Sequence, residues 1–361
     1  MESYIDIDKN MLVSKTVGEV PVVWHDVRNR PFSLYGFDDP CGTPVFHRVP
    51  EAVAEATSAG VSKLSRESAG GRVRFSTDSS YIAVRAKFCV VGRSSHLTLI
   101  STAGFDLYRD GPFGSQYVKE FRMPYDMTDS YEQLVRVDGG RMQAYTVNFP
   151  VHAVVESLEI GIAPGARLEE GASYRSLLPI VIYGSSIVHG TAATRPGNIY
   201  PAILSRMLNM DVRNLGFSGM AKGEQALARW IATLPMSVFV CDYDHNAPDE
   251  EQLAATHYPF YETIRQKNPH LPYIMVTRPD LGVRAEDREQ TLKRRDVIMA
   301  SYLRARAAGD KNVYFVDGLS FQTAPHSSEM TVDNCHPGDA GFVRMADGIG
   351  TVIRYALEQM G

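Results

Sequence analysis

The sequence lacks the features that would place the chain in a membrane or on a nucleic acid. None of its 361 residues lie in an apolar run that reaches the roughly 20 residues needed to span a bilayer. The formal net charge is only -5, so no surplus of basic residues favours a polyanionic partner. The first ten residues are mostly polar and contain no apolar run typical of a secretory signal. We therefore expect a cytoplasmic protein.

Cysteine is scarce, and no spacing indicates a bound metal or cofactor. The four cysteines are Cys41, Cys89, Cys241 and Cys335. Their scattered positions fit reduced thiols better than a disulfide framework or a zinc site. The sequence also has no repeat or low-complexity tract that would favour a scaffold role. We expect neither a cofactor nor a metal, while an oligomer is compatible with the sequence.

The first half of the chain has the periodicity of β-strands. Short β-rich runs, such as residues 81–88, 96–100 and 157–162, are separated by turn-forming residues. Residues 51–65 are the exception, because they have a helical pattern. This half is therefore predicted to form an antiparallel β-sandwich of jelly-roll-like form.

The second half alternates apolar runs of strand length with amphipathic segments of helix length. The five candidate strands are residues 180–183, 212–215, 238–241, 273–276 and 313–316. The last amphipathic segment, from Phe342 to Ala356, has the clearest 3.6-residue period. The alternation predicts an α/β domain built on a five-stranded parallel sheet.

A polar stretch at residues 165–178, rich in Gly, Ala and Ser, separates the two patterns. A chain of 361 residues is long enough for two hydrophobic cores. We expect a β-sandwich domain over residues 1–175 and an α/β domain over residues 176–361. Ligands of parallel α/β sheets bind at the carboxyl ends of the strands, so functional residues are expected there.

A candidate nucleophile follows the first of these strands, in Gly184-Ser185-Ser186-Ile187. A hydroxyl at this position would lie at the rim of the sheet. A serine in such a turn is also a common helix cap, so the tripeptide alone is weak evidence. The α/β-hydrolase elbow needs glycines two positions before and after the nucleophile, and Val188 takes the second of these positions. That fold is therefore not indicated.

A candidate base and acid stand just before the last helix, in Asp333-Asn334-Cys335-His336-Pro337. A serine hydroxyl is a poor nucleophile at neutral pH and needs a base, such as the imidazole of His336. That imidazole needs an acceptor that fixes its tautomer and stabilises its cation, and Asp333 can provide one. Taken alone, an Asp-x-x-His turn is also compatible with a helix cap beside a solvated histidine.

Two further strand ends carry candidate hydrogen-bond donors. Gly219 ends the segment Asn214-Leu215-Gly216-Phe217-Ser218-Gly219, and a glycine lets a backbone N–H approach a ligand closely. Asn246 follows the third strand and could donate from its side-chain amide. Donors of this kind stabilise the negative charge that develops during acyl transfer. Each residue is also compatible with an ordinary turn.

The order of these four blocks resembles the SGNH hydrolase superfamily, also called the GDSL esterases, over roughly residues 178–361. The resemblance implies a three-layer, flavodoxin-like catalytic domain. It also implies that Ser186 is the nucleophile, with Asp333 and His336 completing the triad. Gly219 and Asn246 would join the Ser186 N–H in the oxyanion hole. The first block departs from the usual pattern, because Ser185 stands where many members have Asp.

The first half carries a second resemblance. Gly104-Phe105-Asp106-Leu107-Tyr108 is similar to the Gly-x-Asp-Leu-Tyr motif of a β-domain that precedes some SGNH esterases. We expect Asp106 and Tyr108 to brace a turn against the catalytic domain, with a position in the cleft as the alternative. Because such β-domains often accompany sugar-active domains, the resemblance implies a carbohydrate or glycoside ester as the substrate.

Other polar residues near the strand ends could contact the substrate. The candidates are His189, Arg195, Glu224, His245 and Arg278. Arg278 is the best placed of them, since it comes directly after the fourth strand. By contrast, the run Arg294-Arg295-Asp296 is predicted to be a solvated helix face.

The sequence leaves four functions open. The first is a serine esterase that removes a small acyl group, such as acetyl, from a small molecule or an oligosaccharide. The second is an acyltransferase that passes the same acyl group to an alcohol. The third is a metal-dependent phosphoesterase, with ligands drawn from Asp242, Asp244, His245, Asp333 and His336, although their spacing fits no standard site. The fourth is a non-catalytic carbohydrate-binding protein.

Overall fold

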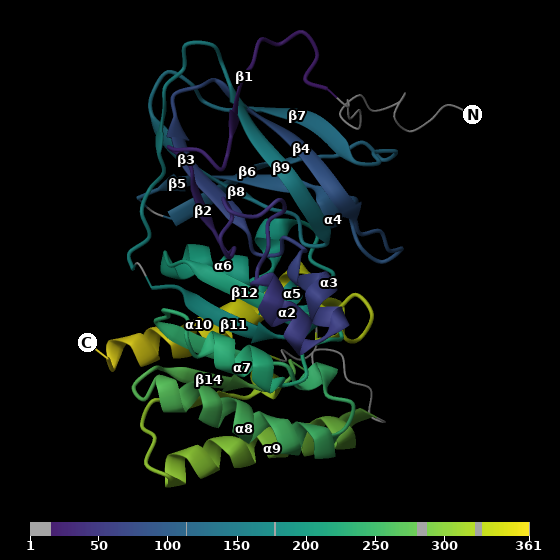
Figure 1. Cartoon of the computed structure of the whole chain (residues 1–361), viewed down its shortest axis with the longest axis vertical. Helices are drawn as coiled ribbons and strands as arrows, with labels where there is room; N and C mark the ends of the chain where they lie inside the picture. The colour runs from purple at the N-terminus through teal and green to yellow at the C-terminus, as the bar shows by residue number, and fades with distance from the viewer. Residues whose placement is uncertain (1–15, 113, 177, 280–286, 322–326, 361) are drawn as a thin grey trace.

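The computed structural model describes residues 16–112, 114–176, 178–279, 287–321 and 327–360. A β-sandwich forms one end of the molecule, and helices α8 (Glu250–Lys267) and α9 (Arg288–Ala307) form the other (Figure 1). A parallel sheet lies between them. Among the described residues, no helix is long and apolar enough to cross a bilayer.

The first half folds into two antiparallel sheets. One sheet has the strand order β1 (Val23–Asp26), β9 (Ala153–Ile162), β4 (Tyr81–Val91) and β7 (Ser130–Arg136). The other has the order β10 (Leu168–Glu170), β3 (Arg72–Thr77), β8 (Gln143–Asn148), β5 (Phe105–Gly111) and β6 (Gly114–Phe121), with β2 (Ser33–Tyr35) paired to β3. Buried aromatic residues, among them Phe75, Phe105 and Phe149, fill the space between the sheets. The predicted β-sandwich is confirmed.

The second half contains a five-stranded parallel sheet, as predicted. Its order is β12 (Val212–Gly216), β11 (Ile180–Gly184), β13 (Val238–Asp242), β14 (Tyr273–Val276) and β15 (Val313–Val316). The other helices of this half are α5 (Ser186–His189), α6 (Tyr200–Leu208), α7 (Gln225–Ile231) and α10 (Asp339–Glu358). Successive strand residues point to opposite faces. Thus Ile182 packs in the cluster with α6 and α10, whereas Tyr183 packs in the cluster with α7, α8 and α9.

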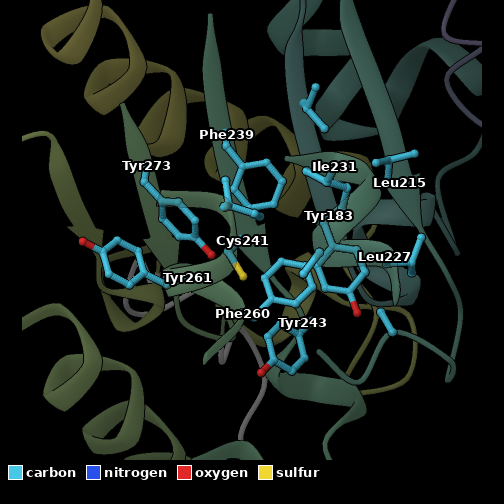
Figure 2. Close-up of a cluster of buried hydrophobic side chains, with 14 of the residues drawn as sticks. Tyr183, Leu215, Leu227, Ile231, Phe239, Cys241, Tyr243, Phe260, Tyr261 and Tyr273 are labelled. Carbon is cyan, nitrogen blue, oxygen red and sulfur yellow. The ribbon is translucent and has the colours of Figure 1, made fainter. Parts of the chain in front are cut away.

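Aromatic side chains pack closely in the cluster that contains Tyr183, on the face of the sheet covered by α7, α8 and α9 (Figure 2). The rings of Tyr183 and Phe260 stack with centroids 4.7 Å apart, and Tyr243 packs beside them. Burying one such side chain contributes about 1.5–3 kcal/mol. Because Tyr183 immediately precedes Gly184 at the end of β11, this packing fixes the strand end from which the nucleophile candidate emerges.

One expectation about the first half was wrong. Residues 96–100 were predicted to be a strand, but α4 (Leu99–Ala103) begins within this run, where the Thr98 side chain accepts a hydrogen bond from Ser101 N–H. The helical pattern predicted at residues 51–65 is confirmed, in two helices: the extended backbone of Ser58 (φ −172°) separates α2 (Glu51–Thr57) from α3 (Ala59–Ser65). Ala54 and Val61, on these two helices, pack in the same buried cluster as residues of α7. Helices α2 and α3, from the first half of the chain, therefore pack as part of the α/β core.

Candidate active site

Ser186 lies where strand β11 turns into α5. The turn is tight, because a Cβ on Gly184 would lie 2.0 Å from the carbonyl oxygen of Asp242. The Ser185 side chain caps α5 by accepting a hydrogen bond from Ile187 N–H. Ser186 is then the first residue of the helix, and its own N–H has no acceptor within the helix. Its side chain and its N–H are thus both available to a ligand at the rim of the sheet.

His336 joins Ser186 to Asp333 in a continuous row of hydrogen bonds. His336 Nε2 lies 2.9 Å from Ser186 Oγ, and His336 Nδ1 lies 2.8 Å from Asp333 Oδ2. The turn between the two residues is closed by the His336 N–H, which donates to Asp333 Oδ1 at 2.7 Å. Asn334 takes a left-handed conformation (φ 62°) in this turn. We call Asp333, His336 and Ser186 the surface row.

The charge of Asp333 sets the tautomer of His336. Burial works to raise the pKa of Asp333, but hydrogen bonds from the backbone and side chain of His336 outweigh it and leave the pKa below its usual value. An ionised carboxylate can only accept, so the proton of the neutral imidazole lies on Nδ1. Nε2 is therefore left as the acceptor for the Ser186 hydroxyl. This arrangement can remove the serine proton during attack on a carbonyl.

The three candidate oxyanion donors follow three adjacent strands. Ser186 follows β11, which lies between β12 and β13 in the sheet, and Gly219 and Asn246 follow these neighbours. Asn246 Nδ2 donates one hydrogen bond to Phe217 O at 2.9 Å, which leaves its second N–H for a ligand. Gly219 is exposed in a left-handed conformation (φ 72°), and its N–H has no acceptor within the described part of the chain.

Three of the five candidate substrate contacts bind other protein groups instead. The His189 side chain is completely buried, and its Nε2 lies 3.0 Å from Glu67 Oε2. Arg195 pairs with Asp106 at 2.8 Å. Glu224 accepts a hydrogen bond from the Tyr183 hydroxyl at 2.7 Å. The side chains of His189, Arg195 and Glu224 therefore already have partners within the protein.

His245 and Arg278 lie nearer to the surface row. The His245 Nδ1 is 4.0 Å from the sulfur of Cys335, the residue next to His336. Burial and the neighbouring Arg278 hold the pKa of His245 well below its usual value, so the ring is neutral. The backbone N–H of Arg278 donates to Asp244 Oδ2 at 2.9 Å. His245 thus borders the site through Cys335, and Arg278 is an electrostatic neighbour of the same cysteine.

The residues of the phosphoesterase alternative do not converge on one point. Within the described ranges, the one group of three side chains able to share a metal ion is Glu67, His152 and His189, which includes none of them. Asp242 accepts instead from the Tyr200 hydroxyl at 3.0 Å, and burial raises its pKa well above the usual value. A neutral carboxyl group is a poor metal ligand.

One residue near the site was missed by the sequence analysis. The ring of His96 lies with its centroid 6.5 Å from that of His336, at an exposed position just before α4. It belongs to the first half of the chain, so this half reaches the rim of the site. No signal in the sequence could have placed it there, because residues 96–100 have the composition of a strand.

Asp106 connects the two halves of the chain. It braces a turn of the second half, as expected. It is completely buried and accepts hydrogen bonds from Arg195 Nη1 and Gly197 N–H of the second half, both at 2.8 Å. Arg195 also donates to the Tyr108 hydroxyl. A Cβ on Gly197 would lie within 2.7 Å of Asp106 and Tyr108, so the contact needs glycine. The Gly-x-Asp-Leu-Tyr motif therefore forms a buried contact between the two halves of the chain.

Comparisons with known proteins agree with both halves of this structure. The model of the GDSL-like lipase/acylhydrolase family matches residues 178–354. The model of the GxDLY family, described as the N-terminus of Esterase_SGNH_hydro-type, matches residues 22–168. A search of curated proteins found no match.

Several solved structures have the same two-part fold. One, described as a GDSL-like lipase from Bacteroides ovatus, is 28% identical, with a TM-score of 0.84 over 94% of this chain and 98% of its own. The salicylyl-acyltransferase SsfX3 from a tetracycline biosynthetic pathway is 20% identical, with a TM-score of 0.73 over 91% and 95% of the two chains. A family two carbohydrate esterase from Clostridium thermocellum, solved with cellohexaose, is 17% identical, with a TM-score of 0.56 over 80% and 93%.

Proposed function

Because the chain belongs to the SGNH, or GDSL-like, hydrolases that carry an N-terminal GxDLY domain, we propose that it is a serine esterase with Ser186 as the nucleophile. The observation that carries the proposal is the row of hydrogen bonds from Asp333 through His336 to Ser186. The preferred substrate in this proposal is a small acyl ester, such as an acetyl ester, on a carbohydrate or glycoside.

The proposed reaction passes through an acyl-enzyme. His336 Nε2 takes the proton of Ser186 Oγ as the oxygen attacks the ester carbonyl. The tetrahedral oxyanion accepts hydrogen bonds from the N–H groups of Ser186 and Gly219 and from the Asn246 amide. His336 then gives the proton to the leaving alcohol, and Asp333 stabilises the imidazolium in between. Finally, His336 activates a water that attacks the acyl-enzyme and releases the acid and Ser186.

Exposure of the surface row supports hydrolysis over acyl transfer. The side chains of His336 and Asp333 are 20% and 38% exposed, so water has access to the base. Transfer to an alcohol requires that water be kept away from the acyl-enzyme. Product ratios measured with increasing alcohol acceptor would separate the two reactions: a yield dominated by free acid supports the esterase, and a yield dominated by new ester supports the acyltransferase.

The carbohydrate part of the proposal comes from the shared architecture. The family two carbohydrate esterase described above has a similar fold over 80% of this chain, and this likeness supports a sugar-borne ester by analogy. We further propose that residues 1–175 and 176–361 are the two domains. The described cysteines are all free thiols, which supports a cytoplasmic location.

The test is the variant Ser186→Ala, assayed with p-nitrophenyl acetate and acetylated oligosaccharides. Loss of a triad serine typically lowers kcat by about 10⁶-fold. Ser130→Ala, at an exposed position on β7, is the matched control and should keep full activity. Activity that survives in Ser186→Ala but disappears with a chelator would overturn the triad in favour of a metal site.

A further inference from the structure

A second row of an acid, an imidazole and a hydroxyl starts in the same helix as Ser186. His189, the last residue of α5, lies between Glu67 and Ser218: its Nε2 is 3.0 Å from Glu67 Oε2, and its Nδ1 is 3.1 Å from Ser218 Oγ. We call Glu67, His189 and Ser218 the buried row. Glu67 comes from the segment just after α3, so the first half of the chain supplies the acid.

The hydrogen-bond partners of His189 fix its tautomer. Its Nε2 faces two acceptors, the Glu67 carboxylate and the carbonyl oxygen of Val151 at 3.2 Å. A carbonyl oxygen cannot donate, so Nε2 must carry the proton. Burial lowers the pKa of His189 to about 4, and the ring is therefore neutral at pH 7. Nδ1 is then an acceptor, and the Ser218 hydroxyl must donate to it.

Glu67 stays ionised in this setting. Burial works to raise its pKa, but hydrogen bonds from His152 and His189 outweigh it and hold the pKa below the usual value. The same oxygen, Oε2, accepts from His152 Nδ1 at 3.0 Å. Its backbone is held as well, because the buried Arg48 donates to Glu67 O at 2.7 Å and to Gly216 O, at the end of β12, at 2.9 Å. The acid is thus fixed relative to the strand that leads to Ser218.

Ser218 matters because of the peptide group that follows it. The N–H of Gly219 belongs to the planar peptide that joins Ser218 to Gly219. The His189 acceptor holds the Ser218 side chain, one residue before the Gly219 N–H. In the preceding peptide group, Asn246 Nδ2 donates to Phe217 O at 2.9 Å. The segment that leads to the Gly219 N–H is therefore held at two points, and one of them leads back to Glu67.

We propose that Glu67 is a positioning residue that acts through His189 and Ser218 to aim the Gly219 N–H at the oxyanion. The inference rests on the proposed esterase function. It assigns the first half of the chain a part in the reaction without any contact to the substrate. An oxyanion donor must point at the oxygen of the transition state, and a displacement of about 1 Å can lower the rate about 10²-fold.

The experiment compares Glu67→Ala, Glu67→Gln and Ser218→Ala in the full chain with p-nitrophenyl acetate. Glu67→Ala and Ser218→Ala should each lower kcat by about 10- to 100-fold, with little change in KM, because the donor acts on the transition state. Glu67→Gln keeps an oxygen acceptor for His189 and should recover part of the loss. Residues that act along one path are not additive, so the double variant Glu67→Ala/Ser218→Ala should lose no more than the worse single variant.

The control is Glu170→Gln, in the exposed ion pair with Arg30, which should keep full activity. Thermal unfolding of each variant identifies any that fail to fold, and Glu67→Gln is the conservative substitution that keeps the test valid if Glu67→Ala does not fold. A normal kcat in a folded Glu67 variant, or an additive double variant, would overturn the relay while leaving Ser186→Ala inactive. Saturable Zn²⁺ binding that is lost in Glu67→Gln would instead assign Glu67, His152 and His189 to a metal site. An active Ser186→Ala would contradict the proposed function itself.

Discussion

The surface row and the buried row contain the same chemical groups in the same order, and they differ in exposure. The His336 side chain is 20% exposed and that of Asp333 is 38% exposed. In the buried row the corresponding fractions are 0% for His189 and 14% for Glu67. An imidazole that must exchange a proton with a substrate needs access to it, whereas one that holds a neighbour in place needs none. Burial, not composition, therefore separates the proposed catalytic row from the positioning row.

Each row also has a second histidine beside it, supplied by the first half of the chain. The ring centroid of His152 is 4.7 Å from that of His189, and the ring centroid of His96 is 6.5 Å from that of His336. His152 shares the Glu67 carboxylate with His189. His96 is exposed and has a hydrogen bond to Ser94 Oγ at 2.9 Å. The first half of the chain thus contacts both rows: His152 contacts the buried row, and His96 lies beside the surface row at the rim of the site.

The largest expected difference between the rows concerns their acids. Asp333→Asn should lower kcat by about 10⁴-fold, because an amide at this position favours the wrong tautomer of the catalytic histidine. Glu67→Gln should cost less than about 100-fold, since it acts only on the position of one donor. Both values come from initial rates on the same acetyl ester.

The control for Asp333→Asn is Asp296→Asn, at a side chain that is 72% exposed on α9. It should leave kcat and KM unchanged. Equal losses in Asp333→Asn and Glu67→Gln would contradict the distinction between a catalytic row and a positioning row.

The sequence predicted one of these rows and could not have predicted the other. Each local pattern, the Ser186 turn and the Asp333-x-x-His336 turn, is weak evidence alone, and the surface row was predicted from the order of the four blocks that resembles the SGNH hydrolases. Glu67 and Ser218 are far apart in the sequence, and Glu67 reaches His189 only because α2 and α3 pack on the α/β core. His189 was predicted to contact substrate, since its position after β11 gives no information about burial.

The sequence does not show which polar side chains are buried, and this also explains the wrong prediction at Arg294. All five parallel strands could be located: four of the predicted segments are continuous apolar runs, whereas β12 also contains Arg213 and Asn214. The predicted solvated face at Arg294 was wrong: its side chain is buried and donates to the carbonyl oxygens of Asp244 and Ala247. A charged side chain that binds backbone carbonyl groups looks the same in the sequence as one that faces water.

Burial of His189 also predicts a pH dependence of stability. Its pKa is about 4 in the folded protein, against 6.5 ordinarily, so the unfolded chain binds this proton first as the pH falls. The contribution is therefore complete above pH 6.5 and is lost as the pH falls toward 4. Its full size is on the order of 3 kcal/mol, from about 1.4 kcal/mol per pKa unit.

The measurement is the free energy of unfolding from urea titrations between pH 7 and pH 4, in the wild type and in His189→Gln. The variant should lose less stability over this range, because it has no imidazole to protonate at this position. His257, whose pKa burial also lowers to about 4, is present in both proteins and cancels in the comparison. Parallel curves for the two proteins would show that His189 is not the buried, neutral group described here.

The smallest expected effect belongs to the exposed neighbour of the surface row. His96→Ala should lower kcat/KM by only about 2- to 10-fold, because an exposed aromatic contact contributes about 0.5–1.5 kcal/mol. The loss should be larger for a sugar ester than for p-nitrophenyl acetate if the ring contacts the alcohol part of the substrate. His270→Ala, at an exposed position after α8, is the matched control. A loss of more than about 100-fold would place His96 in proton transfer, and the surface row would then need a second base from the β-sandwich. A small loss of kcat/KM that depends on the substrate would instead mean that His336 is the base and that His96 acts only in substrate selection.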